Sequence, residues 1–259
     1  MPDRIRLDGK VAVVTGAAGV IGTATIRLLA ERGARIVAVD LREDDLKAAI
    51  TDLPASAQAL AIAADVTSED EVADYVRASI DKFGAIDVFY NNAGIEGDIK
   101  PITQYPLASF RKVIDVNVVG VFLGLKHVLP VMLRQNKGSI INTASIAGLI
   151  GSADIAVYSA SKHAVIGLTK SAALECSGTG VRVNCVCPGM IDSRMLSSII
   201  QGRNPGNAPV PNDRIVERIP ARRLGQPSEV ASIVAFLASD DSSYVSGSAY
   251  TVDGARTAG

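Results

Sequence analysis

Residues 14–29 read VTGAAGVIGTATIRLL, in which an apolar run meets three glycines and then apolar residues at helical spacing. The pattern predicts a buried strand, a tight turn and a helix. Gly16, Gly19 and Gly22 lie where the helix begins, and the free N–H groups and dipole of a helix start attract phosphate. The stretch therefore predicts either a simple turn or a loop that binds the pyrophosphate of a dinucleotide.

The rest of the chain repeats this alternation of strand and helix. The apolar runs that predict strands are 10–16, 34–40, 59–66, 85–94, 138–145, 181–189 and 248–254. The segments that predict helices are 20–32, 41–53, 68–84, 107–136, 156–178 and 227–239. Strands that are apolar throughout are expected where helices cover both faces of a sheet. We therefore predict an α/β fold, a Rossmann-type doubly wound sheet of seven parallel strands in a three-layer α/β/α sandwich.

Composition limits the partners that this chain can have. The 259 residues, 48% of them hydrophobic, show no low-complexity linker, so one domain over 1–259 is expected. Gly, Pro and Asn cluster in 194–220, which is typical of a lid, and we expect a substrate lid there. With 26 basic and 27 acidic residues, a nucleic-acid or anionic membrane partner is not expected. No uninterrupted apolar run reaches the roughly 18 residues of a membrane span.

The cysteines and histidines do not predict a metal site. Cys176, Cys185 and Cys187 are odd in number and lack metal-ligand spacing, and the chain has two histidines. The N-terminus also lacks the apolar core of a secretory signal. We therefore expect a cytoplasmic protein with reduced thiols and no metal.

The acid that ends the second predicted strand supports a dinucleotide site. Asp40 follows Gly16 by 24 residues, close to the spacing at which a carboxylate binds the ribose hydroxyls of adenosine. A carboxylate would repel a 2′-phosphate, and Leu41 beside it supplies no charge that would hold one. Arg42 is the one nearby cation. The pattern favours NAD over NADP, and the alternative role for Asp40 is to cap the following helix.

A serine, a tyrosine and a lysine suggest chemistry in the second half of the chain. Tyr158 and Lys162 lie four residues apart, on one face of a predicted helix. A cation beside a phenol favours the phenolate, so a group whose ordinary pKa is about 10 can act near neutral pH. Ser145 precedes Tyr158 by 13 residues and would polarise a substrate oxygen. The Tyr-x-x-x-Lys spacing alone is common by chance, whereas its combination with the glycine loop is specific.

With these residues the chain resembles the short-chain dehydrogenase/reductase family from about residue 7 to residue 254. The matching motifs are TGAAGVIG (15–22), DV (65–66), NNAG (91–94), DVNVVG (115–120), Ser145, YSASK (158–162), PGMIDS (188–193) and VDG (252–254). The chain departs from the family's TGxxxGxG at Val20, with its extra glycine one place earlier at Gly19. It also continues as VDGA, where the family commonly has VDGG.

The resemblance implies a role for each matching position. The implied catalytic residues are Asn117, Ser145, Tyr158 and Lys162. Tyr158 is the general acid/base, Lys162 lowers its pKa and binds the nicotinamide ribose, and Asn117 kinks its helix and anchors a water. The implied cofactor-binding residues are Gly16, Gly19, Val20, Ile21, Gly22, Asp40, Leu41, Asp65, Val66, Asn92, Tyr158, Lys162, Ile191 and Ser193. Among them, Asp65 and Val66 contact adenine, Asn92 lines the cofactor cleft, and Ile191 and Ser193 meet the nicotinamide carboxamide.

The expected reaction is hydride transfer between NAD and a small-molecule secondary alcohol or ketone. The segments 149–158 and 194–212 are mainly apolar, which favours an uncharged cyclic or aryl-substituted substrate. The residues expected to shape its pocket are Asp154, Ile155, Met190, Met195 and Leu196. Glu96 and Asp98, just past NNAG, are expected in a solvated loop, and the alternative is that they reach the substrate pocket.

Other functions stay open at this point. The enzymatic alternatives are a 3-oxoacyl thioester (acyl-carrier-protein) reductase and a sugar or polyol dehydrogenase. A catalytically silent nucleotide-binding subunit is the non-enzymatic alternative. The family resemblance also implies a homotetramer, built from two long helices and the C-terminal strand.

Overall fold

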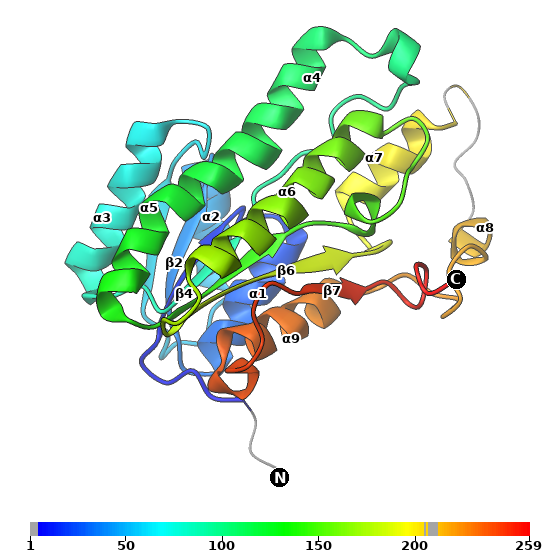
Figure 1. Ribbon diagram of the computed structural model, residues 1–259. Helices are drawn as coiled ribbons and strands as arrows, with labels where there is room; N and C mark the ends of the chain where they lie inside the picture. The colour runs from blue at the N-terminus through cyan, green and yellow to red at the C-terminus, as the bar shows by residue number, and fades with distance from the viewer. Residues whose placement is uncertain (1–4, 205, 207–211) are drawn as a thin grey trace.

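A computed structural model of the chain describes residues 5–204, 206 and 212–259 (Figure 1). Its described strands are β1 (Val11–Thr15), β2 (Arg35–Asp40), β3 (Ala59–Ala63), β4 (Val88–Asn91), β5 (Gly138–Thr143), β6 (Val181–Pro188) and β7 (Ala249–Val252). They form one seven-stranded sheet in the order β3-β2-β1-β4-β5-β6-β7, and every pairing is parallel. The predicted doubly wound parallel sheet is confirmed.

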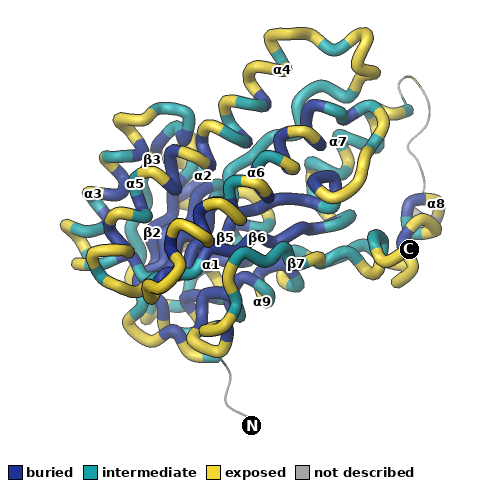
Figure 2. The backbone as a smooth tube through the Cα atoms, in the orientation of Figure 1, coloured by how far each residue is buried: buried dark blue, intermediate teal, exposed yellow. Residues whose placement is uncertain are grey.

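Helices cover both faces of this sheet (Figure 1). The helices are α1 (Val20–Glu31), α2 (Glu43–Thr51), α3 (Glu69–Phe83), α4 (Leu107–Ile114), α5 (Gly120–Gln135), α6 (Ala156–Glu175), α7 (Arg194–Gly202), α8 (Asn212–Val216) and α9 (Pro227–Ala238). Val13 and Phe89 belong to the core shared with α3, α5 and α6, whereas their neighbours Ala12 and Val88 belong to the core shared with α1 and α9. Because successive strand residues point to opposite faces, both sides of the central strands β1 and β4 are buried (Figure 2), whereas the edge strands β3 and β7 are partly exposed.

The strand order reverses between β1 and β4, and this determines where a ligand can bind. Val13 of β1 pairs with Val37 of β2 on one side and with Phe89 of β4 on the other. The connections after β1 and β4 therefore lead away from each other at the carboxyl edge of the sheet. In open α/β sheets, the crevice at such a switch point is the usual ligand site.

The predicted helix over 107–136 is interrupted in its first half. A π-helical turn, Asp115–Val119, joins α4 to α5 and contains Asn117. Such turns occur most often at functional sites. Taken together, Leu107–Gln135 is long and apolar enough to span a membrane by length and composition, and half of its most apolar window is buried in the protein. No membrane-length segment was predicted from the sequence here, because charged residues interrupt the apolar run, whereas the average hydropathy of the helix is high.

The predicted lid at 194–220 contains two short helices, α7 and α8. Residues 205 and 207–211 of this segment lie outside the described residues. The end of α7 is bound to the loop before α6, because Arg203 Nη2 donates to Ser152 Oγ at 2.8 Å and to the Ala153 carbonyl at 2.7 Å. This contact holds α7 beside the N-terminus of α6.

Candidate active site

The glycine loop between β1 and α1 is closely packed. Gly16 has φ +63°, and a Cβ on it would lie 2.9 Å from Ala93 Cα. A Cβ on Gly22 would lie only 2.1 Å from the Gly16 carbonyl oxygen. The Gly19 N–H donates to that same oxygen at 3.2 Å. Val20, where the family pattern has glycine, begins α1 with its side chain about half exposed.

Asp40 joins the end of β2 to this loop. Its Oδ2 accepts from the Ala18 N–H at 3.0 Å, and its Oδ1 accepts from the Leu41 N–H at 2.8 Å. The nearby cation, Arg42, forms an exposed ion pair with Asp45. The negative charge of Asp40 therefore lies directly beside the backbone of the glycine loop.

Asn92 connects three strands at the carboxyl edge. Its backbone N–H donates to Thr15 Oγ1 at 2.9 Å, and its Nδ2 donates to the carbonyls of Thr15 and Gly16, both at 3.2 Å. Thr143 Oγ1 donates to Asn92 Oδ1 at 3.0 Å. These bonds hold the ends of β1, β4 and β5 together next to the glycine loop.

Asn117 binds the loop after β4 to helix α6. Its Oδ1 accepts from the Ile95 N–H at 2.8 Å, and its Nδ2 donates to the Ile95 carbonyl at 2.9 Å and to Ser161 Oγ at 3.0 Å. Ser161 Oγ in turn donates to the Tyr158 carbonyl at 2.7 Å. The π-helical turn thus places a fully buried amide against the helix that carries Tyr158 and Lys162.

Tyr158 and Lys162 lie one turn apart on α6, and both are buried. Lys162 Nζ donates to the Thr143 carbonyl at 2.7 Å and lies 5.7 Å from the centroid of the Tyr158 ring. Burial disfavours the ammonium and lowers the pKa of Lys162 to about 8. Ser145 Oγ accepts from the Ala147 N–H at 3.1 Å, and the interaction of its side chain with the Tyr158 phenol lowers the pKa of that phenol.

The expected lowering of the tyrosine pKa is not found in this structure. Burial of a phenol that is 8% exposed raises the pKa of Tyr158 to about 12, and the hydrogen bond with Ser145 offsets only part of this effect. The charge of Glu96 raises the pKa further. The expected shift depended on a cation close to the hydroxyl, whereas Lys162 Nζ is bound to a backbone carbonyl beside the ring.

Apolar side chains surround Tyr158. Ile155 and Ala147 form a buried cluster with it, and Ile99, Met195 and Ile199 pack against that cluster. Two of the expected pocket residues, Ile155 and Met195, are therefore at the site. This wall combines the loop before α6 with helix α7 and the loop after β4.

The other expected pocket residues have different positions. Met190 lines a separate cavity of about 360 Å³ together with residues of the C-terminal segment such as Gly254. Asp154 has φ +64° and accepts the Lys100 N–H on its carbonyl at 2.8 Å. Leu196 donates its N–H to Ser193 Oγ at 3.2 Å in the first turn of α7.

The remaining predicted cofactor residues lie in loops at the carboxyl edge. Asp65 Oδ1 accepts from both the N–H and the Oγ1 of Thr67 at 2.8 Å, so the strand predicted over 59–66 ends earlier, at Ala63. Val66 packs under α5, where a Cβ on Gly120 would lie 2.9 Å from it. Ile191 is buried, and Ser193 caps α7 while donating to the Ile191 carbonyl at 3.0 Å.

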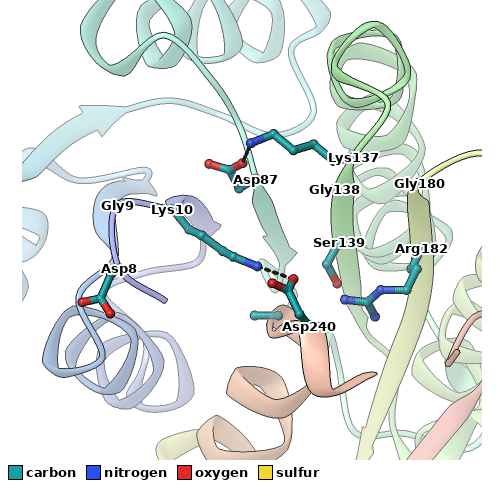
Figure 3. Close-up of a pocket in the computed structure, with 11 residues that line it drawn as sticks. Asp8, Gly9, Lys10, Asp87, Lys137, Gly138, Ser139, Gly180, Arg182 and Asp240 are labelled. Atoms are coloured by element: carbon teal, nitrogen blue, oxygen red, sulfur yellow. Dashed lines mark hydrogen bonds and ion pairs between the residues drawn. The ribbon is translucent and has the colours of Figure 1, made fainter. Parts of the chain in front are cut away.

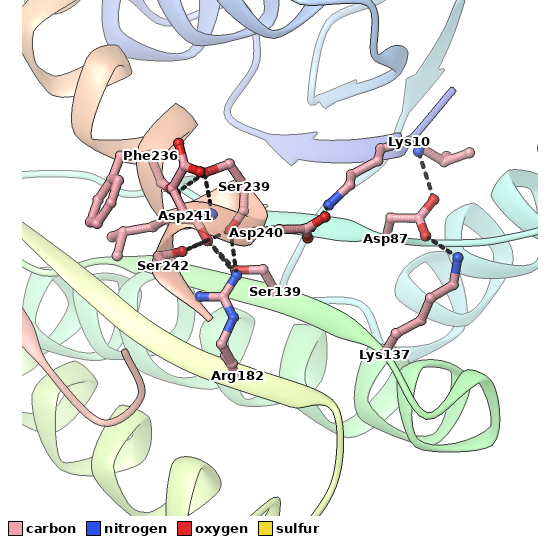
Figure 4. A network of polar contacts seen from close by, with 12 residues as sticks. Lys10, Asp87, Lys137, Ser139, Arg182, Phe236, Ser239, Asp240, Asp241 and Ser242 are labelled. Carbon is pink, nitrogen blue, oxygen red and sulfur yellow. Dashed lines mark hydrogen bonds and ion pairs between the residues drawn. The ribbon is translucent and has the colours of Figure 1, made fainter. Parts of the chain in front are cut away.

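A cavity of about 400 Å³ lies elsewhere, at the amino edge of the sheet (Figure 3). Its lining residues are Asp8, Gly9, Lys10, Asp87, Lys137, Gly138, Ser139, Gly180, Arg182, Ala238 and Asp240. Lys10 pairs with Asp240 at 2.6 Å and Lys137 with Asp87 at 3.0 Å, while Arg182 donates to backbone carbonyls (Figure 4). Its charges therefore neutralise one another, and we assign the polar cluster to stability.

Among the described residues, no group of three or more His, Cys, Asp or Glu side chains is arranged to hold a metal.

Three further residues belong to the site although the sequence analysis did not select them. Thr15 and Thr143 supply the oxygens that bind Asn92 and Lys162, and Ser161 links Asn117 to α6. A polar residue at the carboxyl end of an apolar strand was the available signal for both threonines. Ser161 follows Tyr158 by three residues, and its sequence neighbourhood gives no sign of a role. Its role is seen only in the folded structure, where Asn117 donates a hydrogen bond to it.

Comparison with known proteins agrees with this geometry. The profile of a family described as "Enoyl-(Acyl carrier protein) reductase" matches residues 16–256. Levodione reductase from Leifsonia aquatica is 39% identical over 256 residues, 98% of this chain and 96% of that protein. Cyclohexanol dehydrogenase from Acinetobacter sp. (strain SE19) is 39% identical over 253 residues, 97% and 96% of the two chains.

Solved structures match equally well. The crystal structure of levodione reductase superposes with a TM-score of 0.94, covering 98% of this chain and 99% of that one. The crystal structure of NAD+-bound xylitol dehydrogenase, 38% identical, superposes with a TM-score of 0.92 over 95% and 98% of the two chains. In sequence and in fold, the chain belongs to the short-chain dehydrogenase/reductase family.

Proposed function

We propose that this protein is an NAD-dependent oxidoreductase that interconverts a secondary alcohol and a ketone. The observation that carries the proposal is the buried Tyr158, whose phenol interacts with the side chain of Ser145 and whose ring centroid lies 5.7 Å from Lys162 Nζ. The glycine loop and Asp40 lie at the same edge of the sheet. Relatives named levodione reductase and cyclohexanol dehydrogenase support the same reaction class.

The start of α1 suits a dinucleotide. The N-cap residue of α1 is Gly19, so no side chain caps the helix, and the first turn contains no acidic residue. The N–H groups of the first turn and the positive end of the helix dipole therefore remain available to a pyrophosphate. The residues that would hold NAD are Gly16, Gly19, Val20, Ile21, Gly22, Asp40, Leu41, Asp65, Val66, Asn92, Ile191 and Ser193, with Tyr158 and Lys162. When bound, oxidised NAD supplies a hydride acceptor and a positive charge.

Tyr158 would move the proton of the reacting hydroxyl. Its phenol oxygen takes that proton in oxidation and returns it in reduction, while Ser145 Oγ binds the substrate oxygen. In its protonated form Lys162, whose pKa burial lowers to about 8, would favour the phenolate, against the burial that raises the pKa of the phenol. Asn117 would act mainly by holding Ile95 and Ser161. Its Oδ1 accepts one hydrogen bond from Ile95, and the second lone pair of this oxygen would accept a hydrogen bond from a water.

The surroundings of Tyr158 support a compact apolar substrate. Ile99, Ile155, Met195 and Ile199 form one wall beside its ring. A ring-shaped alcohol or ketone without charge would bury apolar surface there. We therefore infer a cyclic or aryl-substituted secondary alcohol as the substrate class.

We infer a homotetramer of single-domain chains in the cytoplasm, without a nucleic-acid or membrane partner. The apolar side chains Phe110 and Phe122 on α4 and α5 are 41% and 48% exposed. A neighbouring subunit that covered these two side chains would remove them from water, as would be expected of a subunit interface.

Helix α7, in the predicted substrate lid, would contribute to the substrate wall through Met195 and Ile199.

Replacing Asp40 by asparagine tests the cofactor assignment. The change keeps the side chain's size and one acceptor oxygen, and it removes the charge that would repel a 2′-phosphate. We expect the preference for NAD over NADP, measured as the ratio of kcat/KM with cyclohexanol, to fall by about tenfold to a hundredfold. Asp44→Asn in the exposed first turn of α2 is the control and should not change the ratio. A wild-type protein that uses only NADP would overturn the assignment.

A further inference from the structure

Glu96 lies in the loop that follows β4, and this loop passes beside the proposed catalytic lysine. Two residues before it, Gly94 lies against the side chains of the site: a Cβ at Gly94 would be 3.3 Å from both Lys162 Nζ and Asn117 Oδ1. The next residue, Ile95, is held through both its N–H and its carbonyl by Asn117. The backbone that leads into Glu96 is therefore fixed against α6.

The chain is equally well held on the other side of Glu96. Gly97 has φ +73°, and a Cβ there would lie 2.4 Å from the hydroxyl oxygen of Tyr105. The Asp98 N–H donates to that hydroxyl at 3.1 Å. Ile99 then packs against the apolar cluster that contains Tyr158. Glu96 thus lies between two fixed points of the loop, in a segment that contacts the site at Gly94 and at Ile99.

The carboxylate of Glu96 is half-buried and is available to a ligand. Within residues 5–204, 206 and 212–259, it makes no hydrogen bond and no ion pair. Its charge is felt at the Tyr158 phenol, whose pKa it raises. The neighbouring acid behaves differently, because Asp98 lies 3.7 Å from Lys100 Nζ and is paired in the exposed part of the loop.

An unpaired carboxylate in the loop that leads to this apolar cluster has a definite chemical preference. It accepts hydrogen bonds strongly, because a bond to a charged acceptor stabilises more than a neutral one. It repels a second negative charge, and the repulsion grows where water is excluded. The apolar residues Ile99 and Ile155 of the cluster around Tyr158 favour a hydrocarbon ring.

We infer that Glu96 determines the substrate class, by accepting a hydrogen bond from a second hydroxyl group of an uncharged alicyclic substrate and by excluding anionic substrates. The preferred substrate is then a cyclic diol or hydroxyketone in which one carbinol or carbonyl carbon reacts and the other hydroxyl stays unchanged. This inference rests on the proposed function, since it concerns the alcohol that Tyr158 would deprotonate.

The test compares kcat/KM with NAD for cyclohexanol, the 1,2-, 1,3- and 1,4-cyclohexanediols and 4-hydroxycyclohexanecarboxylate. We expect the wild type to prefer at least one diol over cyclohexanol by about tenfold or more, and Glu96→Gln to reduce that preference by about tenfold. Glu96→Gln should also improve the use of the carboxylate relative to cyclohexanol by about tenfold. Glu96→Asp, which keeps the charge, should still reject the carboxylate. Asp98→Asn is the matched control, and its ratios should equal those of the wild type.

The pH profile separates this role from a merely structural one. The groups that face Tyr158 are Lys162 on α6, Ser145 after β5, Cys187 on β6 and Glu96. Cys187 stays protonated, because its hydrogen bond with Cys185 and its burial hold its pKa well above the usual range. A negative charge disfavours the phenolate, so its removal in Glu96→Gln lowers the pKa of Tyr158. The pH at which alcohol oxidation reaches half its maximum should therefore move to lower values in Glu96→Gln and stay unchanged in Glu96→Asp.

The outcomes distinguish this inference from the function on which it rests. If the wild type oxidises cyclohexanol while Glu96→Gln changes neither the substrate ratios nor the pH profile, the role of Glu96 is wrong and the proposed function stands. If the folded wild type binds NAD and oxidises none of these alcohols, the proposed function fails, and the inference fails with it. Thermal unfolding of each variant confirms that the compared proteins are folded.

Discussion

Tyr158→Phe is expected to lower kcat for the oxidation of cyclohexanol by about a hundredfold to ten-thousandfold, the usual contribution of general acid–base catalysis. The substitution removes the phenol oxygen that would take the substrate proton. It keeps the ring, so the packing against Ala147 and Ile155 is retained. The rate of NADH formation at saturating NAD measures the effect.

Binding and folding controls accompany this measurement. NAD affinity should change far less than kcat, because the glycine loop and Asp40 are untouched, and titration of NAD into the variant checks this. Tyr244→Phe, at a fully exposed tyrosine, should match the wild type. A Tyr158→Phe variant that retained more than about a tenth of the wild-type kcat would exclude Tyr158 as the general acid/base.

Gly22→Ala is expected to destabilise the protein by about 1–3 kcal/mol or more, and to weaken NAD binding. The added Cβ would lie 2.1 Å from the Gly16 carbonyl oxygen and 2.8 Å from Ala17 Cα. Both contacts are to backbone, so the glycine loop itself must move, and its N–H groups would no longer be positioned for phosphate. Thermal unfolding and NAD titration measure the two effects.

The same substitution at an open site of another helix provides the control. Gly167 lies on the exposed side of α6, and a Cβ there meets no atom of the described residues within 4 Å. Gly167→Ala should raise stability by about 0.5–1 kcal/mol, since alanine favours the helix. Equal stability of Gly22→Ala and Gly167→Ala would contradict the prediction, because it would show that the glycine loop has room for a Cβ at residue 22.

The sheet was predictable because each strand is a short, continuous apolar run. Seven such runs at helix-length intervals leave a parallel doubly wound sheet as the consistent arrangement. The ends of the strands were less predictable. β3 ends at Ala63 and β4 covers only Val88–Asn91, because the polar residues that follow form hydrogen bonds in loops at the carboxyl edge.

The positions of Tyr158, Lys162 and Ser145 were predictable from local spacing and from family resemblance. What the sequence does not contain is the tertiary environment of these groups. The raised pKa of Tyr158 comes from burial, and the position of Lys162 Nζ depends on the Thr143 carbonyl of another element. Both depend on long-range packing that no motif encodes.

Two contacts between distant segments were also beyond the sequence. Asp40 was expected to face a ribose, and its Oδ2 also accepts the Ala18 N–H, 22 residues earlier. Glu96 was expected in a solvated loop, with the substrate pocket as the alternative, and the residues before it in the loop after β4, Gly94 and Ile95, lie against Lys162 and Asn117. That position depends on Asn117, whose partner Ile95 lies 22 residues before it in the chain.

Transfer of deuterium from a labelled alcohol shows whether the protein moves a hydride from a secondary alcohol to NAD. The protein is incubated with NAD and cyclohexanol that carries deuterium on its carbinol carbon, and the reduced nicotinamide is analysed by mass spectrometry and NMR. We expect deuterium to appear on C4 of the nicotinamide and cyclohexanone to form in equal amount. Reduced nicotinamide without deuterium, or none at all from a folded protein that binds NAD, would contradict hydride transfer from a secondary alcohol of this kind.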